Sequence, residues 1–152
     1  MHELHLMHRD IKLLNIFLCD DSDMPRVKLG DLGLSLKIAP GEKVIKRVGT
    51  VGFMAPEVVL EEPSDLKSDI YSLGIILYIL INTRLPYEAD RYAESKLRKL
   101  MQMEVPFEGP RWQQANPQVV DLLKNMLKVD PEERYSIEQV CSHPWIAAHL
   151  GH

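Results

Sequence analysis

The sequence lacks the features that mark secreted proteins. It holds only two cysteines, Cys19 and Cys141, which are too few for a disulfide framework and favour reduced thiols in an intracellular protein. The N-terminus has no positively charged region followed by an apolar core, so no signal peptide is expected. We therefore expect an intracellular location, with the cytoplasm preferred and the nucleus left open.

Long hydrophobic runs and basic runs are absent as well. The longest apolar run, residues 73–81, is interrupted only by a glycine and is shorter than the roughly 20 residues that cross a bilayer. The formal net charge is -4, and no cluster of lysine and arginine stands out. Neither a membrane nor a nucleic acid is expected as a partner.

What is present suits one globular domain. The chain has 152 residues, of which 45% are hydrophobic and 26% charged. A chain of this length buries roughly 70% of the surface of its unfolded state, which is enough for one core.

Short β-prone segments surround a turn near the N-terminus. Residues 15–20 and 26–29 flank a stretch of acidic residues, serine and proline, which favours a β-hairpin. A further strand is expected over residues 34–38.

Helical patterns fill most of the remaining chain. Residues 68–82 are apolar on nearly every side, which predicts a helix at the centre of the core. Pro56 favours the first turn of a short helix, and residues 92–103 predict an amphipathic helix.

Capping residues mark the helices of the C-terminal third. Asn116 precedes a proline and an apolar pattern at helical spacing, and Ser136 opens a capping box with Gln139. Pro144 is expected to break or kink the last helix. The predicted fold class is mainly α, with a small β-hairpin region at the N-terminal edge.

Four polar residues have the chemistry that phosphoryl transfer requires. Asp10, Lys12 and Asn15 lie close together in sequence, and Asp31 follows. An acid can accept a hydroxyl proton, a lysine can offset phosphate charge, and an amide and a second acid can hold Mg²⁺. Taken singly, each has an ordinary alternative as a capping acid, a solvated lysine or a turn residue. Their order and spacing favour the chemical interpretation.

These residues belong to longer motifs that resemble the large lobe of the eukaryotic protein kinases. The motifs are His8-Arg9-Asp10-Ile11-Lys12-Leu13-Leu14-Asn15, Asp31-Leu32-Gly33, Gly49-Thr50 and Ala55-Pro56-Glu57. Trp112, residues 130–134 and residues 143–146 resemble the calcium/calmodulin-dependent branch of that family. The resemblance implies a protein-kinase-like C-lobe of the α+β type, with residues 1–152 forming a partial kinase domain that has no N-lobe.

The resemblance also implies a reaction and its cofactors. The family transfers the γ-phosphoryl group of ATP to a protein hydroxyl with the help of Mg²⁺. Asp10 is implied as the catalytic base, Lys12 as the cation at the γ-phosphate, and Thr50 as their hydrogen-bonding partner. Asn15 and Asp31 are implied as the ligands of Mg²⁺ in the nucleotide site. Lys12 and Thr50 favour a serine or threonine hydroxyl as the acceptor in a protein substrate.

Apolar residues near this site have implied roles as well. By resemblance, Phe17 faces adenine while Ile16 and Leu18 face the core; the simpler alternative is that all three are core residues. Leu32 replaces the usual phenylalanine of its motif and is expected to keep an apolar packing role. His8 is implied in the same packing column, which agrees with a core histidine whose hydrogen bonds are satisfied.

Several charged residues are implied as structural supports. Glu57 and Arg134 match a buried ion pair, and Asp69 matches an acid that receives backbone N–H groups of the catalytic loop. The alternative for Asp69 is a charge that the helix dipole favours at a helix N-terminus. Arg9 matches an arginine that often binds a phosphate on the activation segment. Because Ser35 and Thr50 carry the only hydroxyls between Asp31 and Glu57, phospho-activation at the usual place is not expected.

Two hypotheses follow from these observations. The first is a serine/threonine kinase lobe, and the second is a non-catalytic, pseudokinase-like interaction module. The 152 residues contain no Gly-x-Gly-x-x-Gly loop, so we expect the isolated chain to be weakly active or inactive. Without an N-lobe, an apolar surface around Leu32 is expected to favour either a covering partner or aggregation. Because Asp10, Lys12, Asn15 and Asp31 are all present, the catalytic hypothesis is favoured.

Overall fold

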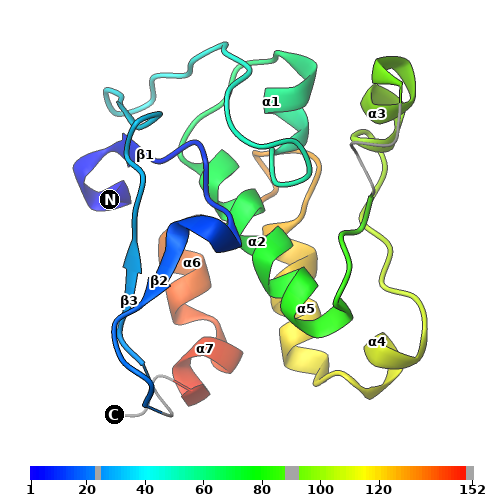
Figure 1. Cartoon of the computed structure of the whole chain (residues 1–152). Helices are drawn as coiled ribbons and strands as arrows, with labels where there is room; N and C mark the ends of the chain where they lie inside the picture. The colour runs from blue at the N-terminus through cyan, green and yellow to red at the C-terminus, as the bar shows by residue number, and fades with distance from the viewer. Residues whose placement is uncertain (23–24, 88–92, 150–152) are drawn as a thin grey trace.

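Helix α2 (Lys67–Asn82) runs through the middle of the computed structural model, which describes residues 1–22, 25–87 and 93–149 (Figure 1). Its buried residues include Ile70, Tyr71 and Ile75, as the apolar pattern predicted. A Cβ on Gly74 would lie 2.8 Å from a methyl carbon of Leu127, so any larger residue there would require the Leu127 side chain to shift. Among the described residues, no helix is both long and apolar enough to cross a membrane.

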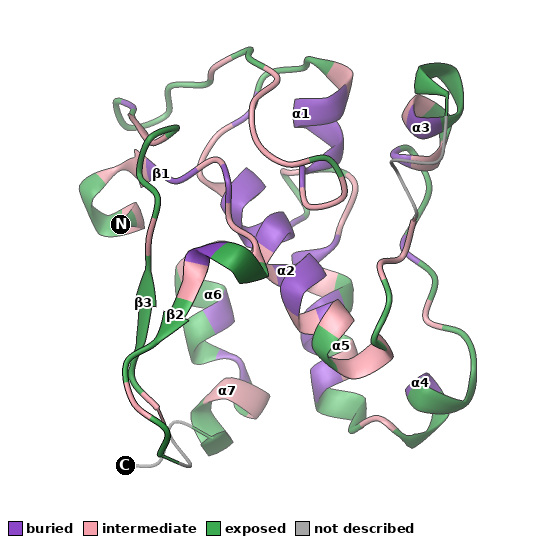
Figure 2. Ribbon diagram, in the orientation of Figure 1, coloured by how far each residue is buried: buried purple, intermediate pink, exposed green. Residues whose placement is uncertain are grey.

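The other helices surround α2. They are α1 (Pro56–Leu60), α3 (Glu94–Leu100), α4 (Pro110–Gln114), α5 (Pro117–Met126), α6 (Ile137–Ser142) and α7 (Pro144–His149). Helices α4 and α5 contact α2 directly. Figure 2 shows buried residues concentrated on α1 and α2, which places the core between them and α5.

Most of the predicted helix boundaries are confirmed. Helix α1 begins at Pro56, and the Asn116 side chain accepts a hydrogen bond of 2.8 Å from the backbone N–H of Gln118 at the start of α5. Both hydrogen bonds of the Ser136 capping box are present. The predicted break in the last helix is present: α6 ends at Ser142 and α7 begins at Pro144. Helix α3 is shorter than predicted, although residue 92 lies outside the described residues.

The predicted hairpin is also confirmed. Strands β2 (Ile16–Leu18) and β3 (Val27–Leu29) pair antiparallel, and part of the turn between them, residues 23–24, lies outside the described residues. The strand expected after Gly33 is β4 (Leu36–Lys37). It pairs with β1 (Leu6–Met7), which the sequence analysis did not anticipate because two residues show no periodicity.

The expected burial of the hairpin is partly wrong. Ile16 is half-buried, but Leu18 is 64% exposed instead of facing the core. All three residues of β3 are exposed too, as the outer edge of the hairpin in Figure 2 shows. A two-stranded ribbon that leaves the body of the molecule has little apolar surface beside it, so alternation along the strand does not produce a buried face.

Short elements escaped prediction. Among the residues that the structure describes are two 3₁₀ turns, η1 (His2–Leu4) and η2 (Leu13–Asn15), and the five-residue helix α4. One helical turn has too few residues to show an apolar period. Helix α4 nevertheless places Trp112 in the core, where its ring packs 4.7 Å from the ring of Tyr78, centroid to centroid.

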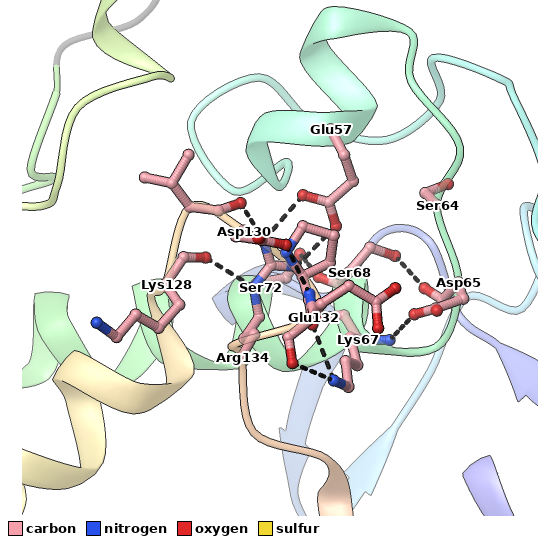
Figure 3. Close-up of polar contacts among 12 residues, drawn as sticks. Glu57, Ser64, Asp65, Lys67, Ser68, Ser72, Lys128, Asp130, Glu132 and Arg134 are labelled. Carbon is pink, nitrogen blue, oxygen red and sulfur yellow. Dashed lines mark hydrogen bonds and ion pairs between the residues drawn. The ribbon is translucent and has the colours of Figure 1, made fainter.

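A buried ion pair joins the N-terminal half of the chain to its C-terminal part. Arg134 and Glu57 are 1% and 2% exposed, and the two Nη atoms of Arg134 lie 2.7 and 2.8 Å from the two carboxylate oxygens of Glu57 (Figure 3). The remaining N–H groups of Arg134 donate to the backbone carbonyls of Lys67, Lys128 and Val129. All five donors of the guanidinium are therefore used, and the expected ion pair is confirmed.

The first prediction concerns this pair. Glu57→Gln keeps the shape of the side chain but leaves the buried charge of Arg134 without an opposite charge. We expect the free energy of unfolding of the chain to fall by about 3–5 kcal/mol, measured by urea denaturation. Glu94→Gln, which removes an exposed partner of Arg47 and Arg98, is the matched control and should change stability little. Equal small effects of the two variants would contradict the structural role of Glu57.

Candidate active site

Asp69, in the first turn of α2, holds the start of the loop that carries the motif residues. Its Oδ2 accepts a 2.7 Å hydrogen bond from the backbone N–H of His8, and its Oδ1 accepts a 2.9 Å bond from that of Arg9. Arg9 has a left-handed backbone (φ 67°), which is uncommon for a residue other than glycine. The carboxylate therefore fixes an unusual turn directly before Asp10, and the contact expected of Asp69 is confirmed.

His8 is fully buried behind this loop. Its Nδ1 lies 3.2 Å from the backbone N–H of Asp10, which can only donate, so Nδ1 accepts. Its Nε2 therefore carries the proton and donates to the carbonyl of Gly30 at 2.9 Å. His8 is a core histidine with both ring nitrogens satisfied, as expected, and it links the loop to the residue before Asp31.

Three other predicted site residues meet at Asp10. Lys12 Nζ lies 2.8 Å from Asp10 Oδ2, and the Thr50 hydroxyl donates to Asp10 Oδ1 at 2.6 Å. Lys12 Nζ also donates to the Thr50 hydroxyl oxygen at 2.8 Å. Asn15 Nδ2 donates to the Asp10 carbonyl at 2.9 Å and lies 3.3 Å from Oδ2. Residues far apart in sequence thus form one hydrogen-bonded cluster around a carboxylate.

These contacts set the charge state of Asp10. Burial by itself raises the pKa of the carboxyl, but the hydrogen bonds from Lys12, Thr50 and Asn15, together with the charge of Lys12, outweigh burial. The net result is that the pKa of Asp10 lies below its ordinary value. The group is a carboxylate at neutral pH and only accepts hydrogen bonds.

Thr50 reaches Asp10 because the preceding backbone touches the loop. Gly49 has φ 116°, and a Cβ there would lie 2.5 Å from the carbonyl oxygen of Arg9. Three residues after Thr50, the carbonyl of Phe53 accepts a 2.7 Å hydrogen bond from the Ser72 hydroxyl of α2. The segment is therefore fixed on both sides of Thr50.

Asn15 and Asp31 are joined through the backbone. The N–H of Gly30 donates to the carbonyl of Asn15 at 2.9 Å, which places the residue before Asp31 directly beside Asn15. Asp31 is exposed, has a left-handed backbone (φ 57°) and accepts a hydrogen bond from the N–H of Gly33. Among the described residues, its side chain makes no hydrogen bond to Asn15.

The side-chain oxygens of Asn15 and Asp31 are suitable ligands for Mg²⁺. The amide nitrogen of Asn15 is held by Asp10, so its amide oxygen is left for another partner. The exposed carboxylate of Asp31 adds a second hard oxygen ligand. Mg²⁺ binds through one or two such protein groups together with phosphate and water, so this donor set fits the ion.

The apolar residues of the predicted nucleotide side are open to solvent. Phe17 is 55% exposed and Leu32 is 56% exposed. The apolar packing that was expected of Leu32 is not formed within the described residues, because the turn of Asp31 directs residues 31–34 to the surface. The Phe17 ring lies beside Gly30, where a Cβ would be 2.7 Å from a ring carbon.

Side-chain contacts hold the segment between Asp31 and Thr50. The Nε of Arg9 donates to the carbonyl of Leu34 at 2.6 Å. Lys43 pairs with Glu132 at 2.6 Å, and Arg47 pairs with Glu94 of α3 at 2.6 Å. These pairs were missed by sequence reasoning, since nothing in a sequence tells which exposed charges meet.

One further site contact was missed. His2 Nε2 lies 3.2 Å from Asp69 Oδ2, the same oxygen that accepts from the His8 backbone. The two residues are 67 positions apart, and His2 lies in a single 3₁₀ turn. No periodicity or motif considered in the sequence analysis pointed to this residue.

Comparisons with known proteins agree with this geometry. Residues 1–146 match the model of the protein kinase domain. A probable myosin light chain kinase of Dictyostelium discoideum is 35% identical over 99% of the chain and 38% of its own length. The meiosis-specific serine/threonine-protein kinase mek1 of Schizosaccharomyces pombe is 34% identical over 98% of the chain and 34% of its own length. Calcium-dependent protein kinase 17 of Arabidopsis thaliana is 36% identical over 95% of the chain and 27% of its own length.

These matches extend over nearly the whole chain, whereas the chain spans less than two fifths of each of these relatives. The mainly helical fold, with two small antiparallel sheets in the described part of the chain, agrees with the family match. The calcium-dependent kinases among the relatives agree with the branch that the C-terminal motifs resemble. The chain belongs to the protein kinase family.

Proposed function

We propose that this chain is the large lobe of a serine/threonine protein kinase, which transfers the γ-phosphoryl group of ATP to a protein hydroxyl. The observation that carries the proposal is the cluster of Asp10, Lys12 and Thr50, whose polar atoms lie 2.6–2.8 Å apart. Phosphoryl transfer requires a carboxylate that orients the acceptor hydroxyl and a cation that stabilises phosphate charge, both held in fixed positions.

Asp10 has room for one more donor. A carboxylate offers about four lone-pair sites, and Thr50, Lys12 and Asn15 occupy three of them. The substrate hydroxyl would donate to the remaining site and would be oriented toward the phosphoryl group. Because the pKa of Asp10 is lowered, Asp10 is a weak base, and it would accept the proton late in the transfer.

Lys12 would serve the phosphate side of the same reaction. Its ammonium group touches both Asp10 and Thr50, which restricts a long and otherwise flexible side chain. A cation held in this way stabilises negative charge on the transferred group at little cost in reorganisation. The same contact with Thr50 supports serine or threonine as the acceptor, in keeping with the printed description of the relative mek1 as a serine/threonine-protein kinase.

The kinase family implies ATP and Mg²⁺ as cofactors and a protein as the substrate. We propose that Asn15 and Asp31 hold Mg²⁺, and that Phe17 lies against the adenine. When bound, the ion would neutralise phosphate charge. The hydrogen bond between the backbones of Gly30 and Asn15 would keep Asn15 and Asp31 at a fixed relative position.

A second candidate function is a non-catalytic interaction module. The observation that favours it is a set of large apolar residues exposed on η2, the hairpin and the following turn, namely Leu13, Leu14, Phe17, Leu18, Val27, Leu29, Leu32 and Leu34. Surfaces of this kind are usually covered by another protein surface. In either function, we propose a partner that covers these residues.

We also propose an intracellular location with no membrane or nucleic acid as a partner. The exposed thiols of Cys19 and Cys141 suit a reducing compartment. The net charge of -4 disfavours binding to phosphate backbones.

The second prediction tests the magnesium ligands. In calorimetric titrations of the chain with ATP, Mg²⁺ should increase the affinity, because Asp31 and Asn15 present hard oxygens. Asp31→Ala should weaken binding of the magnesium complex by about tenfold or more and leave metal-free binding nearly unchanged. Asp21→Ala, which removes an exposed acid from the hairpin turn, is the control. Unchanged magnesium dependence in Asp31→Ala would contradict the proposed ligand.

The third prediction concerns the activity of the chain by itself. With Mg²⁺ and ATP, the chain should transfer phosphate to serine-containing peptides at a rate at or barely above that of the Asp10→Ala variant. The reason is that Phe17, Asp31 and Leu32 are open to solvent, so the nucleotide would be held from one side only. The measurement is radiolabel transfer, with tyrosine peptides as the acceptor control. Robust transfer that Asp10→Ala abolishes would overturn this prediction and strengthen the catalytic proposal.

A further inference from the structure

A cavity of about 560 Å³ opens between four parts of the chain: the N-terminal turn η1, residues 38–43, the start of α2 and the start of α6. Ligand pockets in proteins usually have volumes of roughly 300–1,000 Å³, so this cavity is large enough for a ligand. Asp10, Lys12 and Thr50 do not line it. The cavity is therefore separate from the candidate active site and is a candidate for a second ligand.

The floor of the cavity is aliphatic. Ile38 and Ile70 are buried there, and Leu66 and Ile137 are half-buried beside them. These four residues come from three separate segments of the chain, so the floor exists only in the folded protein. A ligand that covers Leu66 and Ile137 removes their remaining apolar surface from water, which favours binding.

The rim of the cavity carries an excess of negative charge. Its acids are Glu3, Glu42, Asp65, Glu132 and Glu138, and its lysines are Lys43 and Lys67. Both lysines already have partners in the chain. The Nζ of Lys43 lies 2.6 Å from a carboxylate oxygen of Glu132. The Nζ of Lys67 donates to backbone carbonyls, one of which belongs to Glu132 (Figure 3). Among the described residues, none of the other four acids pairs with a lysine or an arginine.

Three of these acids are fixed through one carboxylate oxygen and keep the other oxygen open. One oxygen of Glu42 accepts a 2.7 Å hydrogen bond from a backbone N–H of its own turn, and one oxygen of Asp65 accepts a 2.8 Å bond from the first N–H of α2. Glu138 accepts a 2.6 Å bond from the Ser136 hydroxyl. In the part of the chain that the structure describes, the second oxygen of each carboxylate accepts no hydrogen bond. Because these carboxylates are already oriented, a cationic ligand binds them with a small loss of side-chain entropy.

We propose that this cavity binds an arginine side chain of a peptide segment from a partner protein. The aliphatic stem lies on the floor, and the guanidinium group donates to the open oxygens of the rim, as long cationic side chains do when they cover apolar surface. Arginine suits the rim better than lysine. Its five N–H groups form a planar fork that reaches carboxylates on two walls, whereas an ammonium group is a single point charge.

A peptide fits the cavity better than a free small cation. An ion pair at an exposed rim contributes little by itself. Aliphatic neighbours of the arginine are therefore needed to cover Leu66 and Ile137, and a peptide supplies them. Residues 38–43 form one wall of the cavity and belong to the segment that leads to Thr50. A bound peptide should consequently slow hydrogen exchange of the backbone amides in residues 39–42.

The test is a titration of the whole ¹⁵N-labelled chain, followed in ¹H–¹⁵N spectra. The probes are an acetylated Leu-Arg-Leu amide, the same peptide with citrulline or lysine in the middle, and arginine amide alone. The arginine peptide should shift the amides of Ala39, Leu66 and Ile137 and leave those of Lys12 and Thr50 unchanged, which separates this cavity from binding as a substrate. Citrulline keeps the shape of arginine without its charge, so its peptide should bind about tenfold more weakly or worse.

A pair of double variants tests the rim. Glu3→Gln with Glu138→Gln removes two rim charges and keeps the shape of both side chains. Glu62→Gln with Glu133→Gln is the matched control, because it changes the net charge equally at exposed acids outside the cavity. The first pair should weaken binding of the arginine peptide by about fivefold or more, and the second should leave it nearly unchanged.

Four outcomes would overturn the proposal. The first is the absence of shifts at Ala39, Leu66 and Ile137 with the arginine peptide. The second is equal affinity for the citrulline or the lysine peptide. The third is an equal loss of affinity in the two double variants, which would indicate attraction by net charge alone. The fourth is equal affinity for arginine amide, which would assign the cavity to a small cation. Failure of nucleotide binding or phosphate transfer leaves these measurements intact, so this proposal and the proposed function fail separately.

Discussion

The buried pairing of Arg134 with Glu57 is the constraint on which the rest of the structure depends. A guanidinium that is 1% exposed is tolerated only because a carboxylate and three carbonyls take all five of its N–H groups. These partners come from α1, from the first residue of α2 and from the chain just after α5. One side chain therefore fixes the relative positions of three parts of the chain that no continuous strand or helix connects.

The first two turns of α2 connect Arg134 to the residues around Asp10. The carbonyl of Lys67 accepts from Arg134, the carboxylate of Asp69 accepts from the loop before Asp10, and the hydroxyl of Ser72 donates to the carbonyl of Phe53 near Thr50. Because these three groups sit on one short rigid stretch, the loop that carries Asp10 and the segment that carries Thr50 are held against the same frame. The 2.6 Å contact between Thr50 and Asp10 is the result of that shared support.

The sequence predicted best where chemistry and period are local. The residues from Asp10 to Asn15 share one loop, so their spacing alone indicated that they act together, and the apolar pattern of residues 68–82 predicted the central helix. The partners of Asp69, Glu57 and Thr50 lie 40 to 77 positions away, and only the family resemblance pointed to them. Leu18 and His2 show what is lost without such a guide. Burial of Leu18 depends on whether anything covers the hairpin, and the position of His2 depends on one 3₁₀ turn that has no sequence period.

The end and the middle of the segment before Thr50 are held by different kinds of contact. Its end is fixed by buried groups, since Gly49 touches the carbonyl of Arg9 and Thr50 bonds to Asp10. Its middle is held by one backbone bridge between Val44 and Ser64, and by exposed ion pairs of Lys43 and Arg47. Exposed pairs contribute little each and are weakened by salt, whereas buried hydrogen bonds are hardly screened. The residues around Asp10 should therefore keep their arrangement under conditions that release the middle of the segment, because their contacts do not depend on the exposed ion pairs.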